Sequence, residues 1–167
     1  MLKNGMRFKI KQTSKKGKGV FTTKNFRAGD FVCVLSGERM TSKKIDARID
    51  AGEETCDDPL QISRRMYIDL DELPRTINHS CNPNCGIKRE NKLYALRDIF
   101  SDEELSYDYS TTVPKYKSWW KMRCHCHSKN CRGVISSYDK ISKEQLRVYM
   151  KLGVLPLWVR KFDWFDE

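Results

Sequence analysis

Two polar segments hold the side chains of this chain that are best suited to chemistry. The first is Asn78-His79-Ser80-Cys81, and the second, two dozen residues later, is Tyr107-Asp108-Tyr109. These ring-bearing, hydrogen-bonding residues would form a site for a polar ligand if the fold brought the two segments together. Each segment also has a purely structural interpretation. The first could be a hydrogen-bonded turn, and the two tyrosines could be alternate residues on one face of a strand.

A run of three cysteines follows, with the spacing C-x-C-x4-C at Cys124, Cys126 and Cys131. This spacing places three soft thiolate ligands within reach of one tetrahedral zinc ion and leaves the fourth ligand to come from elsewhere in the fold. Four residues compete for that place: His125, His127, Cys81 and Cys85. Reactive or buried free thiols are the alternative. A disulfide framework is disfavoured because the seven cysteines are an odd number without a secretory signal.

The length and composition indicate about one domain. A chain of 167 residues is large enough to bury a hydrophobic core without disulfides. The sequence has no apolar run approaching the roughly eighteen residues of a membrane span, and its first residues lack the apolar segment of a signal peptide. We therefore expect an intracellular protein without a membrane partner.

The formal net charge of +10 favours acidic partners such as nucleic acid or a nucleosome. The basic residues form two groups, one near the N-terminus and one around the cysteine run: Lys9, Lys11, Lys15, Lys16 and Lys18, and Lys115, Lys117, Lys121, Arg123, Lys129 and Arg132. Solvated surfaces are the alternative interpretation of both groups. Acidic residues gather near the second polar segment, where they would attract a cationic peptide: Asp102, Glu103, Glu104 and Asp108.

Short strands separated by turns must position these segments. Alternation of apolar and polar residues predicts strands over four ranges: 7–11, 31–35, 66–70 and 92–97. A short helix is expected over 42–50, and an irregular, charged loop over 53–64. The sequence thus predicts a mainly β fold with a few short helices.

The C-terminal part carries helix signals instead. Ser142-Lys-Glu-Gln145 has the pattern of a capping box, and Gly153 is placed to end the helix. One apolar face of this helix is expected to hold three residues: Leu146, Tyr149 and Met150. The aromatic stretch 155–167 is expected to pack back onto the domain rather than to bind a partner.

The motifs, in this order, resemble those of the SET-domain protein-lysine methyltransferases. The resemblance rests on Arg75-Thr-Ile-Asn-His-Ser-Cys-Asn-Pro-Asn84, on Glu104-Leu-Ser-Tyr-Asp-Tyr109 and on the cysteine run, which Arg132-Gly133 follows. It implies the SET fold of small curved β-sheets with a pseudoknot, here with a C-terminal helix added. It also implies three parts: a SET domain over 1–115, a post-SET zinc segment over 116–135 and a C-terminal helical extension over 136–167.

The resemblance implies sites for two cofactors. Members of this family bind S-adenosylmethionine through residues that this chain matches at six positions: Gly17, Lys18, Gly19, Arg75, Asn78 and His79. Gly37-Glu38 also matches the family pattern. In members with a post-SET segment, the cysteine of the Asn-His-Ser-Cys motif joins the cysteine run on one zinc ion. Here those ligands would be Cys81, Cys124, Cys126 and Cys131, so that loss of the metal would also disturb the cofactor site.

The resemblance also assigns roles to the two tyrosines. Tyr109 would orient the amine of a substrate lysine beside the transferring methyl group, and Tyr107 would narrow the channel that the lysine enters. In this family a tyrosine at the position of Tyr107 leaves less room for added methyl groups than a phenylalanine does. The sequence therefore predicts mainly monomethylation, extending at most to dimethylation.

Three classes of function are consistent with these observations. The first is an S-adenosylmethionine-dependent methyltransferase acting on a lysine of a histone or another basic protein. The second is a zinc-containing nucleic-acid-binding module, which accounts for the charge and the cysteines but gives the tyrosine motif no role. The third is a SET scaffold without catalysis, against which the intact Tyr109 and Asn78-His79 argue. The first class places the protein in the nucleus of a eukaryote, or in the cytoplasm or among the secreted effectors of a bacterium.

Overall fold

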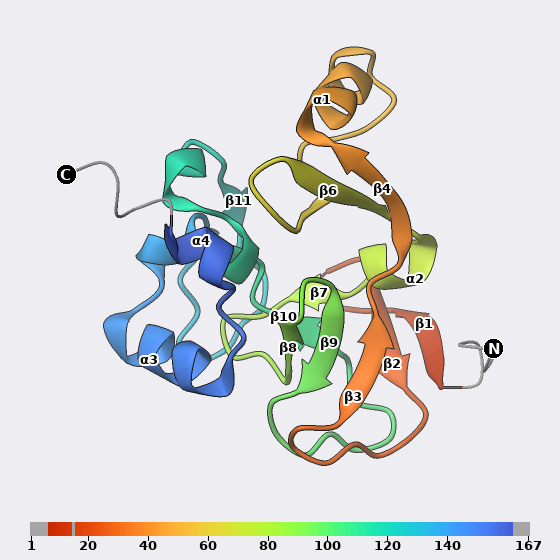
Figure 1. The fold of residues 1–167 in the computed structure, drawn as a ribbon. Coiled ribbons are helices and arrows are strands. Elements are labelled where there is room, and N and C mark those ends of the chain that lie inside the picture. The colour runs from red at the N-terminus through yellow and green to blue at the C-terminus, as the bar shows by residue number, and fades with distance from the viewer. Residues whose placement is uncertain (1–6, 15, 162–167) are drawn as a thin grey trace.

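The computed structural model describes residues 7–14 and 16–161 and consists mainly of short strands (Figure 1). The strands are β1 (Phe8–Gln12), β2 (Lys18–Thr22), β3 (Phe31–Val34), β4 (Gly37–Thr41), β5 (Leu60–Gln61), β6 (Met66–Leu70), β7 (Asn78–His79), β8 (Cys85–Lys88), β9 (Lys92–Ala95), β10 (Ser106–Tyr107), β11 (Met122–Arg123) and β12 (Val134–Ile135). The helices are α1 (Ser42–Asp50), α2 (Glu72–Arg75), α3 (Lys143–Leu152) and α4 (Leu157–Lys161), with the 3-10 turns η2 (Tyr109–Thr112), η3 (Lys115–Lys117) and η4 (Tyr138–Lys140). This arrangement confirms the predicted mainly β fold with a C-terminal helix.

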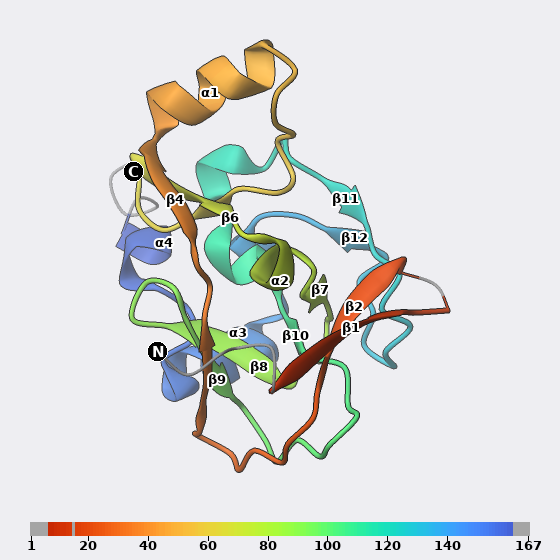
Figure 2. The same cartoon turned by 90° about the vertical axis from the view of Figure 1, so that its right-hand side faces the viewer.

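The strands pair into small sheets around the main hydrophobic core. Two sheets have three antiparallel strands, in the orders β3-β9-β8 and β4-β6-β5. The β1-β2 and β11-β12 pairs are antiparallel, whereas β7 and β10 pair in parallel. Figures 1 and 2 show α1 at one end of the molecule, beyond β4 and β6, and the β3-β9-β8 sheet at the other. The core between them includes the buried residues Val20, Val32, Leu35, Ile68, Ile77, Ile87, Leu93, Ile99 and Leu105.

Local sequence patterns account for most of these elements. Each of the four ranges expected to be strands overlaps one, namely β1, β3, β6 and β9, and the helix expected over 42–50 is α1. The helix begins where it does because the Thr41 hydroxyl accepts a hydrogen bond from the Lys44 N–H at 3.3 Å. The segment expected to be an irregular loop contains the two-residue strand β5, which pairs with β6. A strand of two residues is too short to show the alternation that identifies strands in a sequence.

The signals at the ends of α3 are confirmed, but one residue of its apolar face is not. The Ser142 hydroxyl accepts a hydrogen bond from the Gln145 N–H at 3.2 Å, and Gly153 ends the helix in the left-handed conformation at φ 69°. Tyr149 is 1% exposed, whereas Met150, expected on the same face, is 43% exposed. Met150 lies about 100° further round the helix than Tyr149, and its sulfur contacts Arg160 rather than the core.

The C-terminal extension packs against the β3-β9-β8 sheet. It has its own apolar cluster, formed by Ile141, Tyr149, Val154, Leu155 and Val159, against which Leu96 and Trp158 also pack. Leu155 and Val159 are buried, as expected for a tail that packs back onto the domain, and the rest of that prediction, over 162–167, lies outside the described residues. Within the described ranges no helix is both long and apolar enough to cross a membrane.

Gly86 in β8 lies directly against Val154 of the extension. A Cβ atom added there would lie 2.6 Å from Cγ1 and 2.8 Å from Cβ of Val154. We therefore expect Gly86→Ala to destabilise the protein by about 1–3 kcal/mol, the usual cost of overpacking a close-packed interior. Thermal unfolding followed by circular dichroism measures this loss.

The Val154→Ala background provides the matched control for this substitution. Removing the Val154 methyl groups relieves the 2.6 Å contact but keeps the Cβ atom of residue 154. The double variant should therefore lose less stability than the sum of the two single variants. Strict additivity, or a Gly86→Ala variant as stable as the parent, would show that the extension does not press on β8.

Candidate functional site

The parallel pairing of β7 with β10 brings the two polar segments together. Asn78 lies opposite Ser106, and His79 lies opposite Tyr107. Asn84 helps to hold this register, because its side chain donates to the Glu104 carbonyl at 2.8 Å and accepts from the Ser106 N–H at 2.9 Å. Asn84 is buried, so these hydrogen bonds satisfy an amide that water does not reach. Residues from two segments far apart in the sequence therefore lie side by side.

Tyr109 follows β10 by two residues and lies beside His79 of β7. It is not a strand residue, as the alternation of tyrosines suggested, but the first residue of the 3-10 turn η2. Its hydroxyl donates to the Ile77 carbonyl at 2.7 Å, and its backbone N–H donates to His79 Nδ1 at 3.2 Å. Its ring centroid lies 4.8 Å from that of Tyr107. The two tyrosines therefore adjoin each other even though they belong to different elements.

The two phenols are neutral and differ from free tyrosines. Burial raises the pKa of both Tyr107 and Tyr109, so neither ring ionises near neutral pH. Because the Tyr109 hydroxyl gives its hydrogen to the Ile77 carbonyl, its oxygen presents only lone pairs to other groups. The Tyr109 oxygen is therefore a fixed hydrogen-bond acceptor.

A cavity of about 600 Å³ opens beside these rings. Its lining includes five of the residues predicted to bind cofactor or to act in catalysis: Arg75, Asn78, His79, Tyr107 and Tyr109. The lining also includes a group of aromatic residues that was not predicted, here called the aromatic wall: Tyr67, Tyr116, Trp119 and Trp120. Three of these four aromatic residues lie within five positions just before the cysteine run, which was a usable signal in the sequence. Tyr67 gave no such signal.

The glycine-rich turn 17–19 lies outside the cavity but contacts Asn78, which lines it. Gly17, Lys18 and Gly19 do not line the cavity, but Asn78 Nδ2 donates to the Lys18 carbonyl at 2.9 Å and to Glu104 Oε1 at 2.8 Å. A Cβ atom on Gly19 would lie 2.6 Å from that Glu104 oxygen and 3.0 Å from Asn78 Nδ2. Only a glycine lets the backbone approach the Asn78 amide so closely.

Arg75 lines the cavity, and its side chain forms hydrogen bonds and ion pairs with other residues of the protein. Its guanidinium donates to the Leu70 carbonyl at 2.9 Å and forms ion pairs with Glu54, Asp58 and Asp69. We therefore assign its side chain to the framework of the cavity rather than to direct capture of an anionic ligand. Glu38, by contrast, pairs with Lys44 and Arg48 and does not line the cavity.

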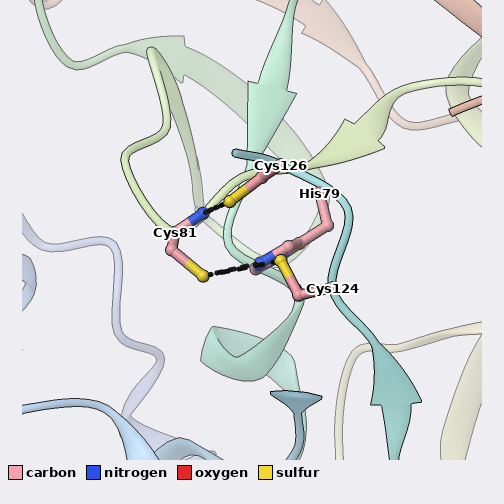
Figure 3. Close-up of side chains that lie close together, drawn as sticks. All are labelled: His79, Cys81, Cys124 and Cys126. Atoms are coloured by element: carbon pink, nitrogen blue, oxygen red, sulfur yellow. Dashed lines mark hydrogen bonds between the residues drawn. The ribbon is translucent and has the colours of Figure 1, made fainter. Parts of the chain in front are cut away.

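Next to the cavity, four side chains gather in the way that metal ligands do. The ligand atoms of His79, Cys81, Cys124 and Cys126 all lie within 4.8 Å of one another (Figure 3). The Cys81 and Cys124 sulfur atoms are 3.7 Å apart, and the Cys126 sulfur accepts from the Cys81 N–H at 3.5 Å. Three of the four predicted zinc ligands are therefore together. Among the rivals for the fourth place, Cys81 joins the group, whereas Cys85 lies in the main core and His125 lines the cavity.

His79 occupies the place where Cys131 was expected, but its hydrogen bonds argue against metal ligation. Burial lowers the pKa of His79 to about 4, so the ring is neutral. Its Nδ1 accepts from the Tyr109 N–H, which leaves the ring proton on Nε2, 3.3 Å from the Cys81 sulfur. His79 Nε2 therefore donates to the sulfur and has no lone pair for a metal.

Cys131 lies beside the group and remains available as the fourth ligand. It packs in the same cluster as Cys81 and Cys124, and its thiol interacts with the Cys124 thiol. The Gly133 N–H points to the Cys131 sulfur at 3.4 Å, and the Arg132 N–H points to the Cys81 sulfur at 3.4 Å. Backbone donors aimed at sulfur atoms stabilise thiolates, the form that binds zinc. The donor set therefore fits a zinc ion held by four cysteines.

The acidic group near the second polar segment is not an open anionic surface. Each member pairs with a basic residue: Asp102 with Lys11, Glu103 with Arg97, Glu104 with Lys16, and Asp108 with Arg132. The tertiary structure thus pairs charges that the sequence shows as unpaired, and the attraction of a cationic peptide by this group stays a prediction. The carboxylates that line the cavity are instead those of Asp46, Asp57 and Asp58.

Comparison with known proteins gives a single family. A family model described as the SET domain matches residues 17–110. The variant-silencing SET domain-containing protein of Plasmodium falciparum is 32% identical over 160 residues, a match that covers 81% of this chain and 6% of that protein. The probable histone-lysine N-methyltransferase set-23 of Caenorhabditis briggsae is 30% identical over 152 residues, covering 79% of this chain and 62% of that protein. The chain thus spans less than two thirds of these relatives.

Solved structures agree with the sequence relatives. The methyltransferase domain of the human histone-lysine N-methyltransferase SETMAR aligns with a TM-score of 0.60 at 25% identity, covering 78% of this chain and 58% of that chain. A second structure, described under the structural basis for the product specificity of histone lysine methyltransferases, aligns with a TM-score of 0.59 at 25% identity, covering 75% of this chain and 54% of that one. The arrangement of small sheets is therefore shared with these proteins.

Proposed function

This chain belongs to the SET domain family, and from that premise we propose that it is a protein-lysine N-methyltransferase that uses S-adenosylmethionine. One observation carries the proposal. Tyr109, whose hydroxyl hydrogen is committed to the Ile77 carbonyl, lines a cavity whose lining also contains Asn78 and His79. A fixed acceptor next to the predicted cofactor residues is what an amine needs in order to be oriented toward a methyl donor.

The cavity fits S-adenosylmethionine by its size and by the chemistry of its walls. Its volume of about 600 Å³ is within the usual range of roughly 300–1,000 Å³ for small-molecule sites. The aromatic wall with Trp119 and Trp120 suits a flat base, and Asn78 in the lining is held in place by the close approach of Gly19 outside the cavity. When bound, S-adenosylmethionine supplies a methyl group on a positively charged sulfur.

The substrate lysine must be neutral to react. A free lysine has a pKa of about 10.4, so at neutral pH only about one side chain in a thousand is the amine, a deficit of roughly 4 kcal/mol. The buried ring of Tyr107 and the half-buried ring of Tyr109 make the channel a poor environment for an ammonium ion and so lower the pKa of a lysine that enters it. A nearby sulfonium acts in the same direction.

Orientation is the second contribution of this chain. The Tyr109 oxygen accepts an N–H of the amine and thereby turns the nitrogen lone pair toward the methyl group. With the amine held by the Tyr109 oxygen, its nitrogen would take the methyl group that the bound cofactor supplies, the electron pair of the broken sulfur–carbon bond would stay on sulfur, and the remaining proton on nitrogen would pass to solvent. No protein nucleophile takes part, which is consistent with two phenols that stay protonated.

The zinc ion in this proposal is structural. Cys81, Cys124, Cys126 and Cys131 would hold it, and His79 would donate to the Cys81 sulfur. Cys81 follows the Asn78-His79 pair directly, and Trp120 of the cavity wall packs in the same cluster. The metal would therefore hold the aromatic wall against the segment that faces the cofactor.

The substrate we propose is a histone or another basic protein. One named relative is described as a probable histone-lysine N-methyltransferase, and the carboxylates of Asp46 and Asp57 at the cavity suit a cationic peptide. The basic groups of the chain, with its net charge of +10, are suited to the DNA of a nucleosome. Such a substrate would place the protein at chromatin, in the nucleus of a eukaryote or, for a secreted bacterial effector, in its host.

Two measurements test the proposed function. Titration with S-adenosylmethionine separates it from a zinc-containing nucleic-acid-binding module, which would show no cofactor binding. Incubation with radiolabelled cofactor and a panel of histones, nucleosomes and cell lysate separates it from a SET scaffold without catalysis. Saturable cofactor binding together with label on a lysine supports the proposal, and binding without transfer to any protein of the panel would favour the scaffold.

The product of the reaction should depend on Tyr107. This residue is 6% exposed, and its ring adjoins Tyr109, so its hydroxyl fills space that added methyl groups would need. We expect the parent protein to form mainly monomethyl-lysine and Tyr107→Phe to shift the early product toward dimethyl- and trimethyl-lysine. Mass spectrometry of the early product measures the distribution. Mainly trimethyl-lysine from the parent, with no change in Tyr107→Phe, would contradict the role of Tyr107.

A further inference from the structure

The carboxylate of Asp108 joins three parts of the chain that are separate in the sequence. Asp108 lies between Tyr107 and Tyr109 and is 2% exposed. Arg132, from the segment that carries the cysteine run, donates to both of its oxygens at 2.7 and 2.8 Å. Tyr149, from helix α3 of the C-terminal extension, donates its hydroxyl to Oδ2 at 3.1 Å. Tyr149 lies outside residues 17–110, where the family model matches.

A buried carboxylate needs every one of these partners. Removing an ion pair from water is costly, and the attraction between Asp108 and Arg132 repays that cost only if hydrogen bonds satisfy the remaining lone pairs. On Oδ1 the Ser110 N–H at 3.1 Å supplies such a bond, and on Oδ2 the Tyr149 hydroxyl supplies it. Burial and the neighbouring carboxylate raise the pKa of Tyr149, so its hydroxyl keeps the proton that it donates.

The orientation of this carboxylate bears directly on Tyr109. Asp108 is the N-cap of η2, the turn that Tyr109 begins, and its carboxylate accepts from the Ser110 N–H within that turn. The same carboxylate lies 3.6 Å from His79 Nδ1, the atom that accepts the Tyr109 N–H. A change in the position of the carboxylate would therefore disturb both the turn after Tyr109 and the hydrogen bond between the Tyr109 N–H and His79.

We propose that Tyr149 is a positioning residue, whose hydroxyl fixes the carboxylate of Asp108 and through it the turn that carries Tyr109. The C-terminal extension then helps to position the residues of the site. It does so although none of its described residues lines the cavity. Its effect on catalysis rests on the proposed methyl transfer, whereas its effect on the turn does not.

The test compares Tyr149→Phe with two control variants of the same apolar cluster. Tyr138→Phe removes the hydroxyl of a half-buried tyrosine that is not a partner of Asp108, and Val159→Ala loosens the extension without touching a hydrogen bond. Amide hydrogen exchange of Ser110, measured by nuclear magnetic resonance on the whole chain without cofactor or substrate, reports the turn directly.

In Tyr149→Phe we expect the Ser110 amide to exchange about fivefold faster, the change in equilibrium that follows from the loss of one hydrogen bond. The amide of Ile45 in α1, whose side chain packs in a separate apolar cluster, should be unaffected. We also expect kcat for methyl transfer to fall about fivefold, while KM for the cofactor changes by less than about twofold, because the hydroxyl acts on geometry rather than on binding. Neither control variant should reproduce this pattern.

Two results would overturn the inference. Exchange at Ser110 that stays at the parent rate in Tyr149→Phe would show that the hydroxyl does not hold the turn. An equal change in Val159→Ala would show that Tyr149 acts only through the folding of the extension. If the parent protein transfers no methyl group at all, the proposed function fails, and the exchange rates still decide whether Tyr149 holds the turn.

Discussion

Replacing Tyr109 by phenylalanine should reduce methyl transfer by about 100-fold or more, the usual loss when a reacting group is no longer held in place. The substitution removes the oxygen that accepts the amine N–H and leaves the Ile77 carbonyl without its 2.7 Å donor. The ring itself stays between His79 and Tyr107, so the wall of the cavity should keep its shape. We therefore expect cofactor affinity to change little, and the protein to lose about 1–3 kcal/mol of stability, the usual cost of a buried carbonyl left without a donor.

Single-turnover transfer of a labelled methyl group measures this effect, and isothermal titration calorimetry measures cofactor binding in the same samples. Tyr94→Phe is the matched control, because it removes a phenol oxygen from β9, where the ring contacts Phe31 rather than the cavity. The control should transfer methyl groups at the parent rate. Transfer by Tyr109→Phe within about tenfold of the parent would remove this residue from its proposed role, since an orienting contact is worth more than that.

Removal of zinc should have the second large effect. Structural zinc in small peptides contributes about 10–16 kcal/mol, which matches or exceeds the total stability of about 5–15 kcal/mol of an ordinary domain. A strong chelator should therefore unfold at least the segment that contains Cys124, Cys126 and Cys131, and should abolish cofactor binding because Trp120 packs on the same cluster. Metal analysis by mass spectrometry should find one zinc ion per chain before chelation, and tryptophan fluorescence should follow its loss.

The choice between Cys131 and His79 as the fourth ligand gives a sharper form of this prediction. Cys131→Ala should lose the metal, because three thiolates remain where a structural site needs four ligands. His79→Ala should keep one zinc ion per chain with weakened affinity, because it removes only a donor to the Cys81 sulfur. Metal content is the decisive measurement, since His79 also faces the cavity. The opposite outcome, in which His79→Ala loses the zinc and Cys131→Ala keeps it, would reverse the assignment.

From the sequence alone, the family, the mainly β fold and the ends of α3 could be predicted. These features depend on signals that are local in the chain. The signals are the order of the motifs around Asn78, Tyr109 and Cys124, short stretches of alternating apolar and polar residues, and the capping pattern from Ser142 to Gln145. Very short strands such as β5 and β7 escaped, because two residues cannot show a period.

Only the tertiary structure decided which of these residues meet and how. Tertiary packing pairs β7 with β10. It also places the Arg75 guanidinium beside carboxylates of the framework, and His79 Nε2 beside the Cys81 sulfur. It also neutralised acidic residues that look unpaired in the sequence, and it brought Tyr149 to Asp108 across 41 positions. Motif residues follow from the chain's own order, whereas hydrogen-bond partners and ion pairs follow from long-range packing, which no local pattern encodes.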